Sequence, residues 1–293
     1  MASDTKVLLE DLVFPEGPRW HDGRLWFSDM HDQRVIAVDL DGRSETIAEV
    51  ANQPSGLGWL PDGRLLVVSM TDRMLLRLDD DGLAEIADLS DLATCHCNDM
   101  VVDDQGRAYI GNFGFDLGSM TDSAALRTAE LVLVTPEGRA SVVADGLAFP
   151  NGTVITPDGS TLIVGETFGG CLTAFTIEPD GSLSNRRAWA EFDDRGFAIE
   201  PGRISPDGIC LDADGGIWVT SPMTREVVRV VEGGEITDRI EVETIAFACM
   251  LGGEDGRTLF LCTAPTHERE PAREQRGGRI EMRTVEVPRA GRP

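Results

Sequence analysis

The sequence predicts an all-β fold, a six-bladed β-propeller, from three observations. First, a turn centred on glycine and followed at once by a short apolar run occurs six times, with glycines at positions 23, 63, 106, 159, 215 and 256. Second, successive copies lie 40 to 56 residues apart, which suits the length of a four-stranded blade. Third, the repeating unit reads as strands alone, because a pattern of alternating polar and apolar residues follows each run.

Each repeat is expected to supply the strands of one blade. The apolar run after each turn predicts one strand, because Asp-Gly favours a tight hairpin in which glycine takes positive φ without strain. Alternation predicts a further strand at residues 34–39, 74–78, 130–134, 171–177, 226–231 and 278–287. Outer strands are expected at residues 44–50, 84–89, 141–146, 187–192 and 237–242.

The sixth repeat lacks an outer strand of its own, since the sequence ends soon after residue 287. Residues 6–15 resemble residues 142–150, where an outer strand leads into the next blade. We therefore expect the N-terminal strand to join the last blade and close the ring, which removes two open sheet edges. Residues 1–293 are then expected to form a single six-bladed propeller domain.

Composition limits the classes of partner. The net charge is −25, from 26 Lys and Arg against 51 Asp and Glu, which argues against binding to nucleic acid or to an anionic membrane. No apolar run approaches the length of a membrane span, and the N-terminal residues do not resemble a signal peptide, so the expected location is cytoplasmic. The six cysteines are accordingly expected to be free, mostly as small core residues.

A short motif lies seven or eight residues before each turn glycine, where the innermost strand of each blade should begin. Its central residues are Glu16, Ser55, Asn98, Asn151, Asp207 and Cys249. By symmetry these six side chains are expected to face the channel from one rim. Four carry a carboxylate or amide oxygen, and such an all-oxygen set suits Ca²⁺, Mg²⁺ or Mn²⁺. Pro-Asp-Gly and Pro-Asn-Gly are also ordinary turn sequences, but here the residue identity changes from blade to blade at a fixed position.

With these motifs the chain resembles the SMP-30/gluconolactonase/luciferin-regenerating-enzyme family of six-bladed propellers over essentially its whole length. The resemblance rests on Glu16-Gly17-Pro18-Arg19-Trp20, Asn98-Asp99, Phe149-Pro150-Asn151-Gly152, residues 181–187 and residues 206–212. It implies one divalent cation, usually Ca²⁺, with Zn²⁺ or Mn²⁺ as alternatives. Its implied ligands are Glu16, Asn151 and Asp207, with Asn98 ligating the cation or contacting substrate. The implied activity is hydrolysis of sugar or other small lactones.

One position departs from that family. Sugar lactonases of the family often carry Arg two residues before the Asn, where it holds substrate hydroxyls, and here the residue is His96. Alternation along an extended strand would place His96 beside Asn98, where it could bind substrate, move a proton or serve only as a polar loop residue. Cys95 and Cys97 are too close in sequence to wrap one zinc ion. Further residues expected near the rim are Asn112, Glu166 and Thr167, with Phe113, Phe115 and Met120 as an apolar lid that would favour a less polar substrate.

The leading hypothesis is a metal-dependent hydrolase that opens a small lactone, either sugar-type or less polar. A cation would polarise the ester carbonyl, Asp207 would accept a proton from the attacking water, and Asn98 would orient the ester. Two alternatives remain open: a phosphotriesterase acting on organophosphates, and a non-catalytic metal-binding propeller. The expected partner is a small lactone or ester, and the chain is expected to be a monomer or a small homo-oligomer.

Overall fold

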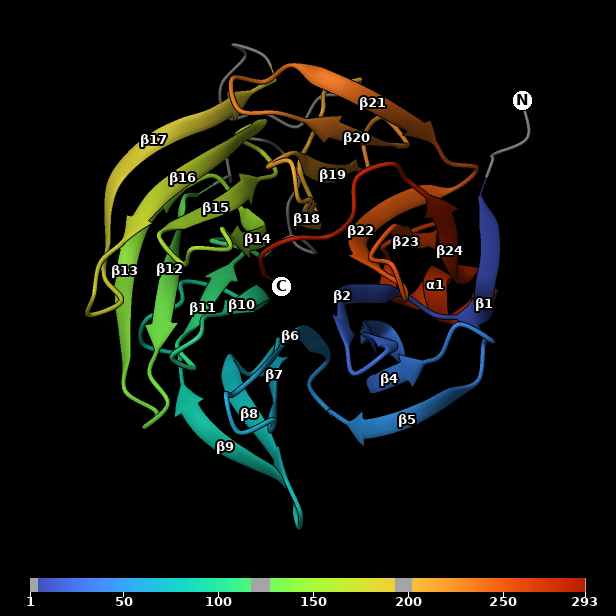
Figure 1. Ribbon diagram of the computed structural model, residues 1–293. Coiled ribbons are helices and arrows are strands. Elements are labelled where there is room, and N and C mark those ends of the chain that lie inside the picture. The colour runs from blue at the N-terminus through green and yellow to red at the C-terminus, as the bar shows by residue number, and fades with distance from the viewer. Residues whose placement is uncertain (1–4, 117–126, 193–201, 293) are drawn as a thin grey trace.

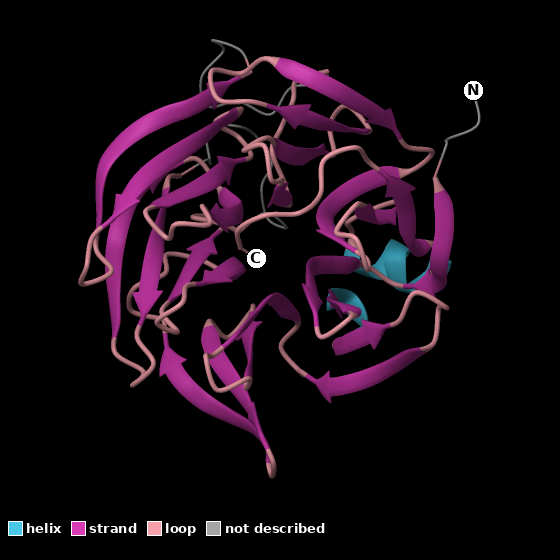
Figure 2. Cartoon of the chain, viewed as in Figure 1, coloured by secondary structure: helices cyan, strands magenta, loops and turns pink. Residues whose placement is uncertain are grey.

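The computed structural model of the protein describes residues 5–116, 127–192 and 202–292. Over these ranges the strands form six four-stranded antiparallel sheets, arranged as blades around a central axis (Figures 1 and 2). In each blade the first strand lies innermost, next to the first strands of the neighbouring blades. The predicted six-bladed β-propeller is therefore confirmed.

The blades follow the chain in order. Blade 1 contains β2 (Pro15–His21), β3 (Arg24–Asp29), β4 (Arg34–Val38) and β5 (Ser44–Glu49). Blade 2 contains β6 (Pro54–Trp59), β7 (Leu65–Ser69), β8 (Met74–Asp79) and β9 (Gly82–Asp88). Blade 3 contains β10 (Cys97–Val102), β11 (Ala108–Asn112), β12 (Ala129–Val134) and β13 (Ala140–Leu147).

The second half repeats this arrangement. Blade 4 contains β14 (Pro150–Ile155), β15 (Thr161–Glu166), β16 (Cys171–Ile177) and β17 (Leu183–Glu191). Blade 5 contains β18 (Ile209–Leu211), β19 (Ile217–Ser221), β20 (Glu226–Val230) and β21 (Ile236–Glu241). Blade 6 contains β22 (Ile245–Gly252), β23 (Thr258–Ala264) and β24 (Gly278–Thr284), completed by β1 (Lys6–Leu12).

The N-terminal strand closes the ring, as the sequence predicts. Strand β1 pairs antiparallel with β24, with Lys6 opposite Met282 and Leu12 opposite Gly278. In Figure 1 the two lie side by side at the outer edge of blade 6, although they come from opposite ends of the chain. The pairing covers the free edge of β24 with backbone hydrogen bonds.

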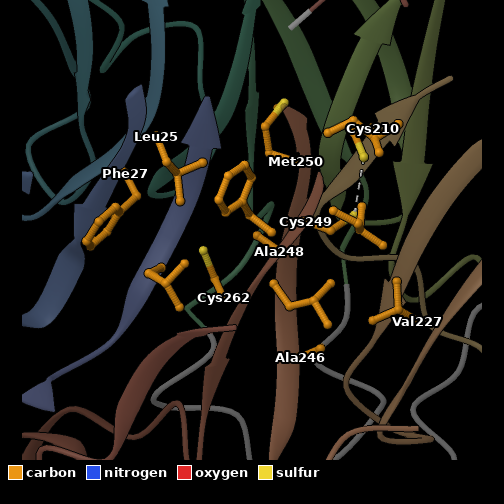
Figure 3. Close-up of a cluster of buried hydrophobic side chains, with 14 of the residues drawn as sticks. Leu25, Phe27, Cys210, Val227, Ala246, Ala248, Cys249, Met250 and Cys262 are labelled. Carbon is orange, nitrogen blue, oxygen red and sulfur yellow. Dashed lines mark hydrogen bonds between the residues drawn. The ribbon is translucent and has the colours of Figure 1, made fainter. Parts of the chain in front are cut away.

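The core lies between neighbouring blades, because inward and outward side chains alternate along each strand. Figure 3 shows the cluster in which blades 5, 6 and 1 meet, with Phe27, Cys210, Cys249 and Cys262 among its buried residues. The Sγ atoms of Cys210 and Cys249 lie 3.7 Å apart. All six cysteines are free, as expected.

Helix is confined to short connections. Within the described ranges there are a 3₁₀ turn, η1 (Met30–Asp32), and one α-helix, α1 (Arg269–Gln275), which Figure 2 shows in cyan. Helix α1 lies within the charged segment 266–277, and of its residues only Ala272 is buried. Among the described residues no helix has the length and apolar character of a membrane span.

The C-terminal residues 285–292, here called the tail, cross one end of the central channel. In Figure 1 the tail runs from blade 6 to the axis. Ala290 N–H donates to Leu211 O (3.0 Å) in blade 5, and Arg292 pairs by two backbone hydrogen bonds with Ile155 in blade 4. This is the end where the inner strands finish, and we call it the far end. A cavity of about 400 Å³ lies there, lined by Trp20, Trp59 and Arg289 among others.

Candidate active site

The opposite end of the channel, where the inner strands begin, is here called the mouth end. Five inner strands carry a one-residue β-bulge at this end, between Glu16 and Arg19, Pro54 and Leu57, Cys97 and Met100, Pro150 and Thr153, and Ala246 and Ala248. A bulge bends its strand and redirects the side chains beside it, and bulges are common next to active sites. The motifs singled out in the sequence lie at these bulges.

Glycines let the inner strands converge at the mouth end. A Cβ on Gly56 would lie 2.4 Å from the Met100 backbone nitrogen, and one on Gly152 would lie 2.4 Å from that of Ile209. No side chain fits at such distances, so glycine is required there for close approach of two backbones. The neighbouring Ser55, Asn98, Asn151 and Asp207 are brought close to the axis as a result.

Glu16 and Asp207 form a pair of acids that are largely removed from water, with Asp207 buried and Glu16 half-buried. Burial raises the pKa of the Glu16 carboxyl to about 8, and the charge of Asp99 adds to the rise. Burial also raises the pKa of Asp207 well above its usual range, with further contributions from the charges of Glu16 and Asp99. Glu16 Oε2 accepts a hydrogen bond from Gly17 N–H (2.7 Å). An acid whose pKa is raised by a neighbouring acid, as Asp207 is by Glu16, is stabilised by a cation or a proton beside it.

Asn151 belongs to the same group. Its side chain donates to Asp207, which partly offsets the rise in the Asp207 pKa, and its Nδ2 also lies 3.2 Å from Thr167 Oγ1. Thr167 Oγ1 in turn donates to Pro206 O (2.7 Å). Asn151 and Asp207 come from different blades, so this chain of hydrogen bonds fixes their relative position. The structure therefore brings Glu16, Asn151 and Asp207 together.

Asp99 is an acid that the sequence reading did not assign to the site. Its carboxylate accepts from Arg19 Nη2 (2.6 Å) and from Met100 N–H (2.8 Å), and its charge acts on both Glu16 and Asp207. Arg19 is 3% exposed and also donates to Leu57 O (3.1 Å) and Pro18 O (2.7 Å). Its guanidinium thus links blade 1 to blades 2 and 3 and forms an ion pair with Asp99. The position of Asp99 next to Asn98 in the sequence could have indicated that Asp99 lies near the site.

Asn98 and His96 are the less constrained members of the predicted set. Asn98 is buried, and its Nδ2 has no hydrogen-bond partner within the part of the chain that the structure describes. His96 is half-buried and packs edge-to-face against Phe113, with ring centroids 6.0 Å apart. The alternation argument for placing His96 beside Asn98 does not hold, because β10 begins only at Cys97 and bulges before Met100.

The donor set meets the requirements of a hard divalent cation. Two neighbouring carboxylates largely removed from water would be stabilised by a cation, and a buried amide without a partner can turn its oxygen toward one. Among the described residues no three His, Cys, Asp or Glu side chains cluster closely enough to hold a metal by themselves. A site here would therefore need the amide oxygens of Asn151 and Asn98 beside Glu16 and Asp207.

Blade 6 does not follow the predicted symmetry. Gly208 N–H donates to Phe247 O (2.8 Å), so Phe247 and its neighbour Ala248 lie beside Asp207. The Cys249 thiol instead lies against Cys210 and the carbonyl of Trp218 in the core between the blades (Figure 3). The prediction that Cys249 faces the channel is therefore wrong, since a bulge between Ala246 and Ala248 shifts the alignment.

The weaker candidates at the rim serve the fold. Asn112 donates to Glu130 and accepts from Gly114 N–H, while Glu166 accepts from Ala148 N–H and Thr173 Oγ1. Phe113 and Phe115 pack with Phe149 and Phe168 in one aromatic cluster. Met120, the third residue expected in the apolar lid, lies outside the described residues.

Comparisons with known proteins agree with this architecture. Residues 14–265 match the family model described as the SMP-30/Gluconolactonase/LRE-like region. The chain is 30% identical over 172 residues to a 6-deoxy-6-sulfogluconolactonase of Pseudomonas putida, a match covering 57% of this chain and 53% of that protein. It is 22% identical over 290 residues to a gluconolactonase of Zymomonas mobilis, covering 89% and 79% respectively.

The fold is also shared with solved structures. A calcium-binding protein, regucalcin, from Agrobacterium tumefaciens superposes with a TM-score of 0.79 at 21% identity, covering 99% of this chain and 97% of that one. At this identity the similarity concerns the fold.

Proposed function

The chain belongs to the SMP-30/gluconolactonase/LRE-like family, and from that premise we propose that it hydrolyses a small lactone with the help of one divalent cation. Named relatives are lactonases, which supports the reaction class. The observation that carries the proposal is a pair of acids with raised pKa values, the half-buried Glu16 and the buried Asp207, with the Asn151 amide on Asp207 at the mouth end. Buried acids with raised pKa values in a channel are typical of catalytic sites.

We propose Glu16, Asn151 and Asp207 as ligands, with Asn98 as a fourth ligand or a substrate contact. Ca²⁺ is the first choice, because oxygen donors suit it and a neighbour of the same fold is named a calcium-binding protein. Zn²⁺, Mn²⁺ and Mg²⁺ are the alternatives. When bound, the cation would polarise the lactone carbonyl and stabilise the developing negative charge on its oxygen.

The side chains then have separate roles. Asp207 accepts a proton from the attacking water, and the Asn151 amide holds its carboxylate in place. The water oxygen bonds to the carbonyl carbon, the ring C–O bond breaks, and the proton passes to the leaving oxygen to give a hydroxy acid. The Asn98 amide orients the ester. His96 binds the substrate or relays the proton.

The proposal is tested by assaying the purified chain after chelation and reloading with Ca²⁺, Zn²⁺, Mn²⁺ or Mg²⁺. Proton release is measured on aldonolactones, alkyl lactones and a phosphotriester. We expect metal-dependent opening of at least one lactone class. Hydrolysis of the phosphotriester alone would establish the alternative phosphotriesterase. Tight Ca²⁺ binding without any turnover would contradict the lactonase proposal and support the non-catalytic metal-binding propeller.

A further inference from the structure

Apolar side chains gather at the mouth end, where the predicted site lies. They form two buried clusters, here together called the apolar belt: Phe115, Phe149 and Phe168 in one, and Phe14, Met30, Met70 and Phe247 in the other. Each of the phenylalanines lies close in sequence to the mouth end of a strand, Phe14 and Phe149 directly before β2 and β14. Phe113 packs against both clusters and joins them.

Phe113 connects the belt to the predicted site. Its ring stacks on Phe149 at 4.7 Å and meets the His96 ring edge-to-face at 6.0 Å. Its N–H donates to His96 O (3.0 Å), which fixes the two residues relative to each other. Phe113 is half-buried, whereas Phe149 is only 5% exposed. Phe113 is therefore the aromatic ring in this cluster that keeps the most accessible surface.

Phe149 is held where its backbone is strained. Its φ is +64°, a region that large L-residues rarely adopt. Its carbonyl accepts from Thr167 N–H (3.1 Å), and Pro150 and Asn151 follow directly. Strain of this kind persists where the surrounding structure imposes it, and it is common at functional sites. The fold thus keeps a large apolar ring next to the Asn151 position.

Polar side chains near the belt are mostly committed to the protein itself. Asn112, Glu166 and Thr167 each hold at least two internal hydrogen bonds. Within the described ranges, the neutral side chains of the predicted site without a hydrogen-bond partner are the Asn98 amide nitrogen, the His96 imidazole and the Ser55 hydroxyl, while Glu16 and Asp207 are the proposed cation ligands. An aldonolactone carries several hydroxyls, and a buried hydroxyl without a partner opposes binding.

We propose that the substrate is a lactone with an apolar substituent, and that Phe113 is a specificity-determining residue that packs against that substituent. This inference rests on the proposed lactonase function and narrows its substrate class. One polar end, the ester, meets Asn98, and the apolar remainder lies along Phe113. Polyhydroxylated lactones are poor substrates, because Phe113 and the apolar belt offer their hydroxyls no hydrogen-bond partners.

The experiment measures kcat/KM for a homologous series of γ-alkyl lactones and for glucono-δ-lactone. Each methylene that packs against Phe113 is expected to raise kcat/KM by up to about fourfold, from about 0.8 kcal/mol per buried methylene. Glucono-δ-lactone is expected to be at least about tenfold poorer than the best alkyl lactone. Equal or better hydrolysis of glucono-δ-lactone, with no chain-length effect, would overturn the inference and leave the lactonase proposal intact. No hydrolysis of either class would instead contradict the proposed function.

Variants assign the effect to Phe113. Phe113→Ala is expected to flatten the chain-length dependence, and Phe113→Leu to reduce it by less, since Leu keeps part of the apolar surface. Phe175→Leu is the matched control, because Phe175 is buried between blades in another cluster. Melting temperatures identify any variant that fails to fold. A chain-length dependence unchanged in both Phe113 variants, or altered equally by Phe175→Leu, would remove Phe113 from this role.

Discussion

The acidic side chains at the two ends of the channel have different surroundings. At the far end, Asp103 accepts from the N–H groups of Gln105 and Arg107 and from the Arg107 side chain, all within its own turn. At the mouth end, burial raises the pKa values of Glu16 and Asp207, the charge of Asp99 adds to both rises, and the charge of Glu16 adds to that of Asp207. An acid paired within its turn supports the fold, whereas acids whose pKa values are raised by burial and neighbouring charge are available for chemistry.

Two buried ion pairs make the contrast sharper. Arg19–Asp99 and Arg107–Asp103 both have their closest atoms 2.6 Å apart and side chains at most 11% exposed. They differ in what surrounds them, since only Asp99 lies close enough to act on the acids of the predicted site. Matched substitutions at the two ends should therefore give different results.

The largest contrast is expected between Asp207→Asn and Asp103→Asn. Asp207→Asn should lower kcat/KM at least about 10²-fold, because it removes the proposed base. It should not lower the melting temperature of the metal-free protein, since it removes repulsion with Glu16. Asp103→Asn should leave kcat/KM of the folded protein within about twofold and lower the melting temperature by about 6 °C, because Arg107 loses its partner.

Steady-state kinetics and calorimetry on both variants check this pair. Comparable losses of activity in the two would show that the mouth end is not chemically special.

Deletion of residues 1–10 should lower the stability of the protein without changing the residues at either end of the channel. It removes most of β1 and exposes the edge of β24, and we expect the melting temperature to fall on the order of 10 °C. Because β1 lies at the outer edge of blade 6, kcat/KM of the remaining folded fraction should stay close to that of the parent. An unchanged melting temperature would refute the importance of the closing strand.

Arg19→Gln and Arg107→Gln each leave a buried carboxylate unpaired, at a cost of about 3 kcal/mol, or about 6 °C in melting temperature. Added Ca²⁺ should restore part of the loss in Arg19→Gln only, because the unpaired charge of Asp99 then adds to the negative charge near Glu16 and Asp207, which a cation offsets. Calorimetry with and without Ca²⁺ measures this. An equal Ca²⁺ response in the two variants would mean that Asp99 lies outside any cation site.

The smallest effect is expected from removing residues 288–293. This deletes the backbone hydrogen bonds from the tail to Leu211 and Ile155, and we expect a fall of about 3 °C in melting temperature. Since the tail lies at the far end, kcat/KM should change by less than about twofold. A large loss of activity would show that the two ends are coupled.

Much of the fold could be predicted from the sequence, because its signals are local. Glycine turns mark each blade, and the likeness of residues 6–15 to residues 142–150 predicted the pairing of β1 with β24. Helix α1 was not predicted, since five of its seven residues are charged or polar and no apolar face marks it in the sequence.

The site was less predictable, because its geometry depends on contacts between blades. Glu16, Asn151 and Asp207 were found through their shared position in the repeat. The role of Asp99 depends on Arg19, which lies 80 residues away in sequence. Cys249 was misplaced because a bulge in β22 shifts the register by one residue, which no local pattern indicates.

The tail and Arg19 together have a kinetic consequence. Arg19 reaches from blade 1 to blades 2 and 3 and the tail crosses the far end, so both obstruct passage through the ring. We therefore expect the proposed substrate to enter, and its product to leave, at the mouth end. We expect the hydroxy-acid product to compete directly with incoming substrate, so that product inhibition is competitive. The protein's net charge of −25 would favour departure of that anion.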